Sequence, residues 1–229
     1  MPQEESPRKL IGFMLPWIEF HYANLLFAGI VGELEKAGYL IVFKRVMSEP
    51  DAESRALREL LDLGVDGLIV AAGKGEYFNG DLVRLVLNQF PVVMVEKYMR
   101  DLKSYGVYCD TEKAGYLMGR HLAEQKAEQI ALISYPEHFT LGVKERIFGF
   151  QSAMVRHGIP PLPPEQILIV PESLLDGAHQ LDVNFRCEPI MQFLKERPGL
   201  NAVATIDSWL AQLVCHALNE LGKYDTVVV

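Results

Sequence analysis

The stretch LIGFMLPWIEFHYANLLFAGIVGELEKAGYLIVFKRV, residues 10–46, decides the fold class. Residues 10–15 are a continuous apolar run, as expected of a strand that is buried on both faces of a parallel sheet. Residues 24–37 then carry apolar side chains at helical spacing, and Gly38 follows as a typical residue after a helix end. A second apolar run over residues 39–46 completes a strand–helix–strand unit.

The same alternation of apolar runs and amphipathic segments continues along the chain, which predicts βα units and parallel sheets. In the first half, further strands are expected at residues 65–72 and 91–95, with helices at 51–63 and 82–89. In the second half, the expected strands are 107–109, 129–134, 167–170, 202–206 and 226–229, and the expected helices are 112–125, 143–157, 188–195 and 209–221.

The two halves of the chain also resemble each other. IGFML with a helix ending in EKAGY matches IALIS with a helix ending in VRHGI, and LLDLGVDGLIV matches LKERPGLNAVAT. We therefore predict two tandem lobes, residues 10–105 and 106–229, after a polar tail or linker remnant over residues 1–9. Each lobe is expected to be a doubly wound α/β unit on a parallel sheet. Ligands bind beyond the carboxyl ends of such strands, so a ligand cleft between the lobes is expected.

Composition and charge narrow the range of functions. The 229 residues are 49% hydrophobic and 23% charged, as in ordinary globular proteins. Nucleic-acid binding needs a basic surface that neutralises backbone phosphates, and the formal net charge here is -8. We therefore expect that this chain does not itself bind nucleic acid. The apolar stretch IGFMLPWI is interrupted at Glu19 and is too short for a membrane span or a signal peptide. We expect a cytoplasmic protein with no membrane partner.

No catalytic, cofactor or metal motif stands out, so we predict that the chain is not an enzyme. The glycines of GKGEYFNG, residues 73–80, lack GxGxxG spacing and do not follow the first strand. The six histidines lack HExxH or comparable spacing. Cys109, Cys187 and Cys215 lie far apart without CxxC spacing, which predicts small buried hydrophobic residues rather than a disulfide framework or a zinc site.

Six segments, by their order and spacing, resemble the lactose-repressor and ribose-binding-protein group, which has the periplasmic-binding-protein type I fold. They are GIVGELEKAGY, PDAESRALRELLDLGVDGLIV, PVVMVEK, VYCDTEKAGYLMGRHL, KERIFGFQSAM and AVATIDSWLAQLVCHALNELG. The resemblance implies the sensor part of a bacterial, repressor-like transcription regulator of the LacI family. Such a sensor binds a small effector, most often a sugar, and lobe closure then acts on the DNA-binding domains. The alternative is an exported solute-binding protein of the same fold that serves a transporter or chemoreceptor.

The resemblance also implies partners and a missing segment. A homodimer is expected, with operator DNA bound only through an N-terminal helix-turn-helix or winged-helix domain outside this chain. In the family, a strand resembling DTVVV at the chain end, residues 225–229, continues into a Gly-aromatic-Asp turn and returns to the first lobe. We therefore expect that the final return segment of the second lobe is absent from this sequence.

In the first lobe, the resemblance places ligand contacts in the loop after the first strand. Aromatic residues of that loop usually stack on a sugar or base, which here implies contacts from Trp17, Phe20, His21 and Tyr22. The alternative is that Phe20 and Tyr22 cap the core beneath the first helix.

Glu96 and Lys97 stand where family members often have an Asp-Arg pair at the end of the fourth strand, so they too are implied to contact ligand. Lysine lacks the bidentate fork of arginine, and a solvated surface pair is the alternative.

In the second lobe, Arg146 in KERIFGF matches the arginine with which the family clamps ligand. We expect it in the first turn of its helix, where the helix dipole does not favour a cation, so that it needs an external partner. The alternative is a pair with Glu145 or Glu137. Ile206 replaces an asparagine that many members use for ligand hydroxyls, which indicates a less polar or differently shaped ligand end.

Asp207 and Trp209 are the remaining implied ligand contacts. Asp207, like Asp110, directly precedes a helix, so N-capping is its first expected role and ligand contact its second. Trp209 follows within the same turn.

Overall fold

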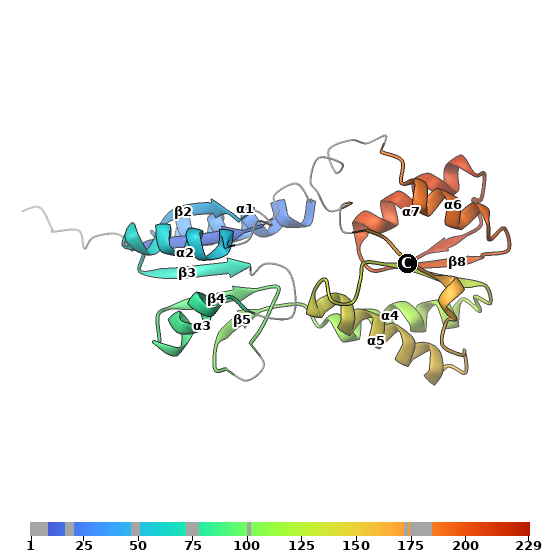
Figure 1. Cartoon of the computed structure of the whole chain (residues 1–229), viewed down its shortest axis with the longest axis horizontal. Coiled ribbons are helices and arrows are strands. Elements are labelled where there is room, and N and C mark those ends of the chain that lie inside the picture. The colour runs from blue at the N-terminus through green and yellow to red at the C-terminus, as the bar shows by residue number, and fades with distance from the viewer. Residues whose placement is uncertain are drawn as a thin grey trace, which may run out of the picture. The chain divides into compact units, whose positions relative to one another are not determined.

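The computed structural model describes residues 9–16, 21–46, 51–71, 78–99, 102–171, 174 and 185–229. The chain divides into two units, Met1–Cys109 and Asp110–Val229. Each unit is built on a parallel β-sheet with helices beside it (Figure 1). The two parallel α/β lobes predicted from the sequence are therefore confirmed.

The first sheet has five parallel strands in the order β2-β1-β3-β4-β5. Its strands are β1 (Leu10–Leu15), β2 (Leu40–Arg45), β3 (Gly67–Ala71), β4 (Val92–Val95) and β5 (Tyr105–Val107). Its helices are α1 (His21–Lys36), α2 (Ala52–Asp62) and α3 (Gly80–Leu87). The strand order reverses at β1, since the chain leaves β2 and continues on the other side of β1 with β3. Such a reversal opens a crevice at the carboxyl ends of the strands, where ligands bind in open α/β sheets.

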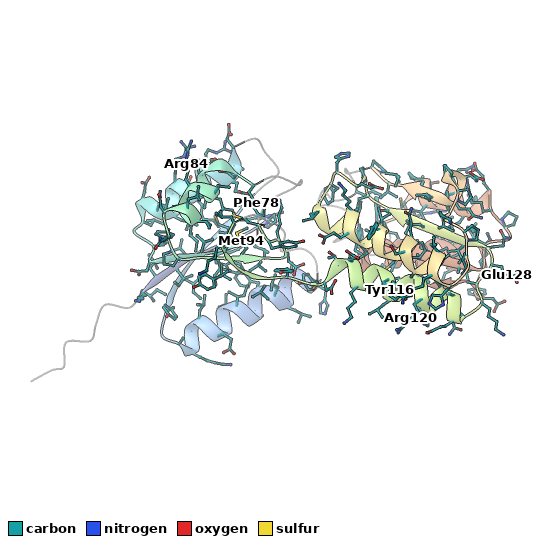
Figure 2. All side chains as sticks on the ribbon, turned by 90° about the horizontal axis from the view of Figure 1, so that it is seen from below. Phe78, Arg84, Met94, Tyr116, Arg120 and Glu128 are labelled. Atoms are coloured by element: carbon teal, nitrogen blue, oxygen red, sulfur yellow. The ribbon has the colours of Figure 1, made fainter. Side chains whose placement is uncertain are left out.

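Helices cover both faces of the first sheet because side chains alternate along each strand. Phe13 of β1 and Val95 of β4 pack with α1, and the Phe13 ring lies 5.6 Å from the ring of Phe27. Met14 and Met94 face the opposite way and pack with α2 and α3. Figure 2 shows α3 and α1 on opposite sides of the strand that carries Met94.

The second sheet has four parallel strands in the order β7-β6-β8-β9. Its strands are β6 (Ile130–Ser134), β7 (Ile167–Ile169), β8 (Ala202–Thr205) and β9 (Val227–Val228). Its helices are α4 (Thr111–Glu124), α5 (Leu141–Arg156), α6 (Glu188–Lys195) and α7 (Ser208–Glu220), with a 3-10 turn η1 (Pro164–Gln166). In Figure 1, α4 and α5 lie on one side of this sheet and α6 and α7 on the other. All residues of β6 and β8 are accordingly buried.

Helices α4 and α5 touch backbone to backbone. A Cβ atom on Gly115 would lie 1.9 Å from the carbonyl oxygen of Arg146, and one on Gly149 would lie 1.9 Å from that of Glu112. Only glycine permits so close an approach at these two positions. The contact fixes how α5 lies against α4 and thus where Arg146 stands.

Several expected element boundaries differ from the structure by one to three residues, and two of the differences bear on the site. The sequence placed residues 107–109 at the start of the second array, but β5 pairs with β4, with Val95 opposite Val107, and completes the first sheet. The fifth helix begins at Leu141 rather than 143, because the Thr140 side chain accepts a hydrogen bond from the Val143 N–H at 3.2 Å and caps it.

Candidate functional site

A tyrosine–glutamate contact lies at the carboxyl edge of the first sheet. The hydroxyl of Tyr22, the second residue of α1, donates to Oε1 of Glu96 at 2.5 Å. Partial burial, together with the bond to Glu96 and its charge, raises the pKa of Tyr22. The hydroxyl is therefore held as a donor that orients the Glu96 carboxylate. Tyr22 is 49% exposed, so it does not cap the core; Leu26 and Phe27 pack there instead.

Glu96 directly follows β4 and has a backbone φ of 64°, in the left-handed region. This conformation costs a residue with a Cβ atom about 1–2 kcal/mol. The cost is a reason to examine the position as a functional site, because strained residues persist where the surroundings hold them for a purpose. The bend directs the Glu96 carboxylate toward α1.

Lys97 packs with a different part of the first unit. Its Nζ lies 4.5 Å from the centroid of the Phe78 ring, and the side chain is only 8% exposed. Figure 2 shows Phe78 on the side of the sheet where α3 lies. Burial lowers the pKa of Lys97, and the charge of Glu53 on α2 opposes that shift. Lys97 therefore does not belong to a solvated surface pair, and it does not join the contact between Tyr22 and Glu96.

The other predicted contacts of the first unit lie at or before the start of α1. Trp17 and Phe20 lie outside the described residues. His21 is the first residue of α1 and is exposed. Of the four predicted residues in this loop, the structure therefore connects Tyr22 to Glu96.

In the second unit, Arg146 and Asp207 lie near each other at the carboxyl edge of the sheet. The Arg146 guanidinium donates to the carbonyl oxygen of Ile206, the residue after β8. Asp207 follows directly and caps α7, since its Oδ1 accepts from the Leu210 N–H at 2.9 Å. Burial raises the pKa of Asp207, whereas the Leu210 N–H and the charge of Arg146 act in the opposite direction. The capping role predicted for Asp207 is confirmed, as is that of Asp110, which accepts from the Lys113 N–H at 2.9 Å.

The partner of Arg146 differs from the one expected. Arg146 is the sixth residue of α5, in the second turn, so the unfavourable helix dipole invoked from the sequence does not apply. Glu145, its predicted alternative partner, accepts the Thr111 hydroxyl at 2.5 Å. Ile206 is 2% exposed, so its side chain is buried and its backbone carbonyl is the group that Arg146 contacts at the edge of the sheet.

Two aromatic residues complete the edge of the second sheet. Trp209 is 9% exposed, and its ring stacks on Phe185 at 6.5 Å between centroids. Tyr135, the first residue after β6, is 2% exposed and packs on Phe139 at 5.4 Å. Sequence reasoning missed Tyr135, although an aromatic residue directly after the buried run IALIS was a usable signal.

The expectation for the cysteines is correct in one case and wrong in two. Cys187 is buried, but Cys109 and Cys215 are exposed. Cys109 follows the exposed edge strand β5, and Cys215 lies on the outer face of α7. Within the described ranges, no group of three or more His, Cys, Asp or Glu residues could hold a metal ion. None of the described helices is long and apolar enough to cross a membrane.

Known proteins resemble the chain over most of its length. Residues 9–223 match the family described as periplasmic binding proteins and sugar binding domain of LacI family. The arabinose metabolism transcriptional repressor of Halalkalibacterium halodurans is 27% identical over 170 residues, which cover 73% of this chain and 44% of that protein. The HTH-type transcriptional regulator DegA of Bacillus subtilis is 26% identical over 152 residues, or 66% of this chain and 45% of that protein. The chain thus spans less than half the length of these relatives.

Solved structures show the same architecture. A LacI-family transcriptional regulator from Enterococcus faecium, solved with bound ribose, is 27% identical and has a TM-score of 0.72. The match covers 96% of this chain and 76% of that one. The match to the family over residues 9–223 confirms the family predicted from the six sequence segments. The chain belongs to the family of periplasmic binding proteins and LacI-family sugar-binding domains.

Proposed function

We propose that the chain is the effector-binding part of a LacI-type transcription regulator and that its effector is a small, uncharged sugar. The observation that carries the proposal is that Arg146, bonded to the Ile206 carbonyl, lies near Asp207 at the carboxyl edge of the second sheet. A sugar hydroxyl both donates and accepts, so one guanidinium and one carboxylate can bind adjacent hydroxyls. The relatives include an arabinose metabolism repressor and a regulator solved with bound ribose, which supports this ligand class.

The charges favour an uncharged ligand over a phosphorylated one. The charge of Arg146 acts to lower the pKa of Asp207, so the cation of the second unit stands near an acidic group rather than alone. In the first unit, Glu96 accepts from the neutral Tyr22 hydroxyl, and Lys97 is buried against Phe78 instead of facing Glu96. A phosphate would therefore find no surplus positive charge among these residues. We retain Tyr22, Glu96, Arg146 and Asp207 as proposed ligand contacts.

The regulatory part of the proposal extends beyond this chain. We infer a cytoplasmic homodimer whose DNA-binding domains belong to a segment outside the sequence described here. Sugar binding would favour one arrangement of the two lobes, because a ligand shifts an equilibrium only by binding one state better than the other. The arrangement would then alter operator affinity.

Isothermal titration calorimetry of this chain tests the ligand class. The panel contains L-arabinose, D-ribose, cellobiose, the corresponding sugar phosphates and purine bases. We expect one uncharged sugar to bind, and we expect Arg146→Met to weaken it about tenfold or more, as for a lost charge-assisted hydrogen bond. Arg156→Met is the matched control, because Arg156 is exposed at the far end of the same helix.

Binding only by phosphorylated sugars or purines would contradict the proposal, as would an Arg146→Met affinity within about twofold of the original. The regulatory part is tested on the complete gene product by gel shift with its own upstream DNA. The bound sugar is expected to change the DNA affinity, and an unchanged affinity would separate sugar binding from DNA regulation.

A further inference from the structure

We propose that Tyr135 and Trp209 form a donor subsite for ligand oxygen atoms at the carboxyl edge of the second sheet, and that the Tyr135 hydroxyl helps to select the sugar. The proposal rests on the sugar-binding function proposed above. It adds a residue, Tyr135, that the sequence did not bring forward, and it gives the indole N–H of Trp209 a definite role.

The first observation is that two buried donors lack a well-placed partner. Within the described part of the chain, neither Oη of Tyr135 nor Nε1 of Trp209 meets an acceptor at full hydrogen-bond geometry, although the Asp207 carboxylate lies beside the Tyr135 hydroxyl. Leaving such a group buried and unpaired costs about 1–3 kcal/mol. Phenylalanine at position 135 would avoid the cost. A ligand oxygen that is better placed than Asp207 would account for the hydroxyl.

The second observation is that both donors flank the proposed ligand contacts. Strands β6 and β8 pair with Ile133 opposite Thr205, so Tyr135 and Asp207 leave the sheet at equivalent positions. Trp209 lies in the first turn of α7, two residues after Asp207. Burial raises the pKa of Tyr135, and both the charge of Asp207 and an interaction of its carboxylate with the Tyr135 hydroxyl add to the shift. Asp207 is therefore the acceptor beside the hydroxyl, although the two do not meet at full hydrogen-bond geometry.

The chemistry of the group fits a pair of neighbouring hydroxyls. Tyr135 and Trp209 would each donate to a ligand oxygen, and the ligand hydroxyls would donate in turn to Asp207. Arg146 donates one N–H to the Ile206 carbonyl and has further N–H donors for a ligand. Both unpaired donors are shielded from solvent in this structure, so the proposal includes a side-chain rearrangement when the ligand arrives.

The test compares Tyr135→Phe with the unmodified chain in two measurements. Removing an unpaired buried hydroxyl should leave the urea unfolding midpoint unchanged or higher. The same change should weaken the sugar about three- to tenfold by calorimetry, as for one neutral hydrogen bond. Tyr224→Phe is the matched control, because that side chain in the same unit is 77% exposed, and neither quantity should change.

A ligand-side comparison locates the lost bond. Monodeoxy analogues of the sugar are titrated into both proteins. For one analogue, the affinity should fall in the unmodified chain but not fall further in Tyr135→Phe, because the two changes remove the same hydrogen bond. Trp209→Phe, which keeps a ring against Phe185, provides the second donor test, and it should also weaken the sugar.

The outcomes separate this inference from the proposed function. If the sugar binds Tyr135→Phe and Trp209→Phe as tightly as the unmodified chain, the subsite is wrong and the sugar-binding function stands. If no sugar binds the unmodified chain, the proposed function fails. The unfolding measurement then still decides whether Tyr135 is free of a structural partner. A lower midpoint for Tyr135→Phe would overturn the inference in either case, because the hydroxyl would then serve the fold.

Discussion

Glu96 and Gln89 share the same backbone strain at two different places in the first unit. Their φ values are 64° and 60°, and Gln89 lies just beyond α3, away from the proposed ligand contacts. We expect Gln89→Gly to raise the free energy of unfolding by about 0.5–1 kcal/mol. Glycine relieves the backbone strain, and part of that gain is offset because glycine increases the conformational entropy of the unfolded chain. Urea unfolding measures this change, and sugar affinity should not move.

Glu96→Gly should relieve the same strain but lose the bond from Tyr22 and the proposed sugar contact. We therefore expect a smaller gain in stability than for Gln89→Gly, together with weaker sugar binding by calorimetry. Equal sugar affinity in the two glycine variants would show that Glu96 does not contact the ligand.

Asp207 should make the stability of the second unit depend on pH in a defined direction. Burial raises its pKa in the folded state, so the folded chain holds a proton that the unfolded chain has already released. Stability contributed by this group is thus lost as pH rises from the unfolded pKa through the folded one. Asp207→Asn, which still caps the helix, removes this loss.

Urea unfolding of both proteins from about pH 4 to about pH 7 checks the sign. The free energy of unfolding of Asp207→Asn, relative to the unmodified chain, should increase across that range. A difference that decreases with pH would mean that the Asp207 carboxylate is stabilised in its charged form.

Local signals in the sequence predicted some of these residues and not others. Asp110 and Asp207 were recognisable as caps because capping depends on a few neighbouring residues. The separation of Glu96 from Lys97 was not predictable, since it follows from a left-handed φ and from the packing of Phe78. The position of Tyr135 after the buried run IALIS was readable from the sequence, but its closeness to Asp207 follows from the pairing of β6 with β8, which the sequence does not specify.

At the scale of elements, the contact between α4 and α5 positions Arg146. Gly115→Ala would place a Cβ atom 1.9 Å from the Arg146 carbonyl oxygen if nothing moved. Because the obstacle is backbone, the helices must separate, and we expect the second unit to lose ~1–3 kcal/mol of stability. Sugar affinity should fall as well, since α5 carries Arg146.

Gly32→Ala on α1 is the matched control for helix propensity, because nothing lies within 4 Å of the added Cβ atom. This substitution should stabilise the first unit by about 1 kcal/mol. Differential scanning calorimetry follows both variants. A Gly115→Ala protein as stable as the Gly32→Ala protein would mean that α4 and α5 do not pack so closely.

Strands and helices were largely predictable because buried runs and amphipathic periods are local patterns. The exception is β5, where residues 105–107 are all exposed and form a three-residue edge strand. Such a strand has no apolar signature, and its pairing with β4 brings it into the first sheet instead of the second. The contact between α4 and α5 could not be predicted from the sequence either, because a glycine at helical spacing does not identify the helix that packs against it.

At the scale of the whole chain, the two sheets repeat one design. In each, the first strand of the array lies inside the sheet rather than at its edge, with β1 between β2 and β3 and β6 between β7 and β8. The proposed contacts follow from this design, because Tyr22 and Glu96 come from the edge of one sheet and Arg146 and Asp207 from the edge of the other. The sequence repeat predicted the design; it did not predict which side chains at each edge face one another.

The central claim is that Arg146 and Asp207, at the carboxyl edge of the second sheet, bind an uncharged sugar. Amide NMR spectra of the isotope-labelled chain, titrated with the sugar that binds in calorimetry, test it most directly. We expect shifts at Arg146 and Asp207 that saturate with one dissociation constant. Shifts confined to the first unit, or centred away from the carboxyl edge of the second sheet, would contradict the claim.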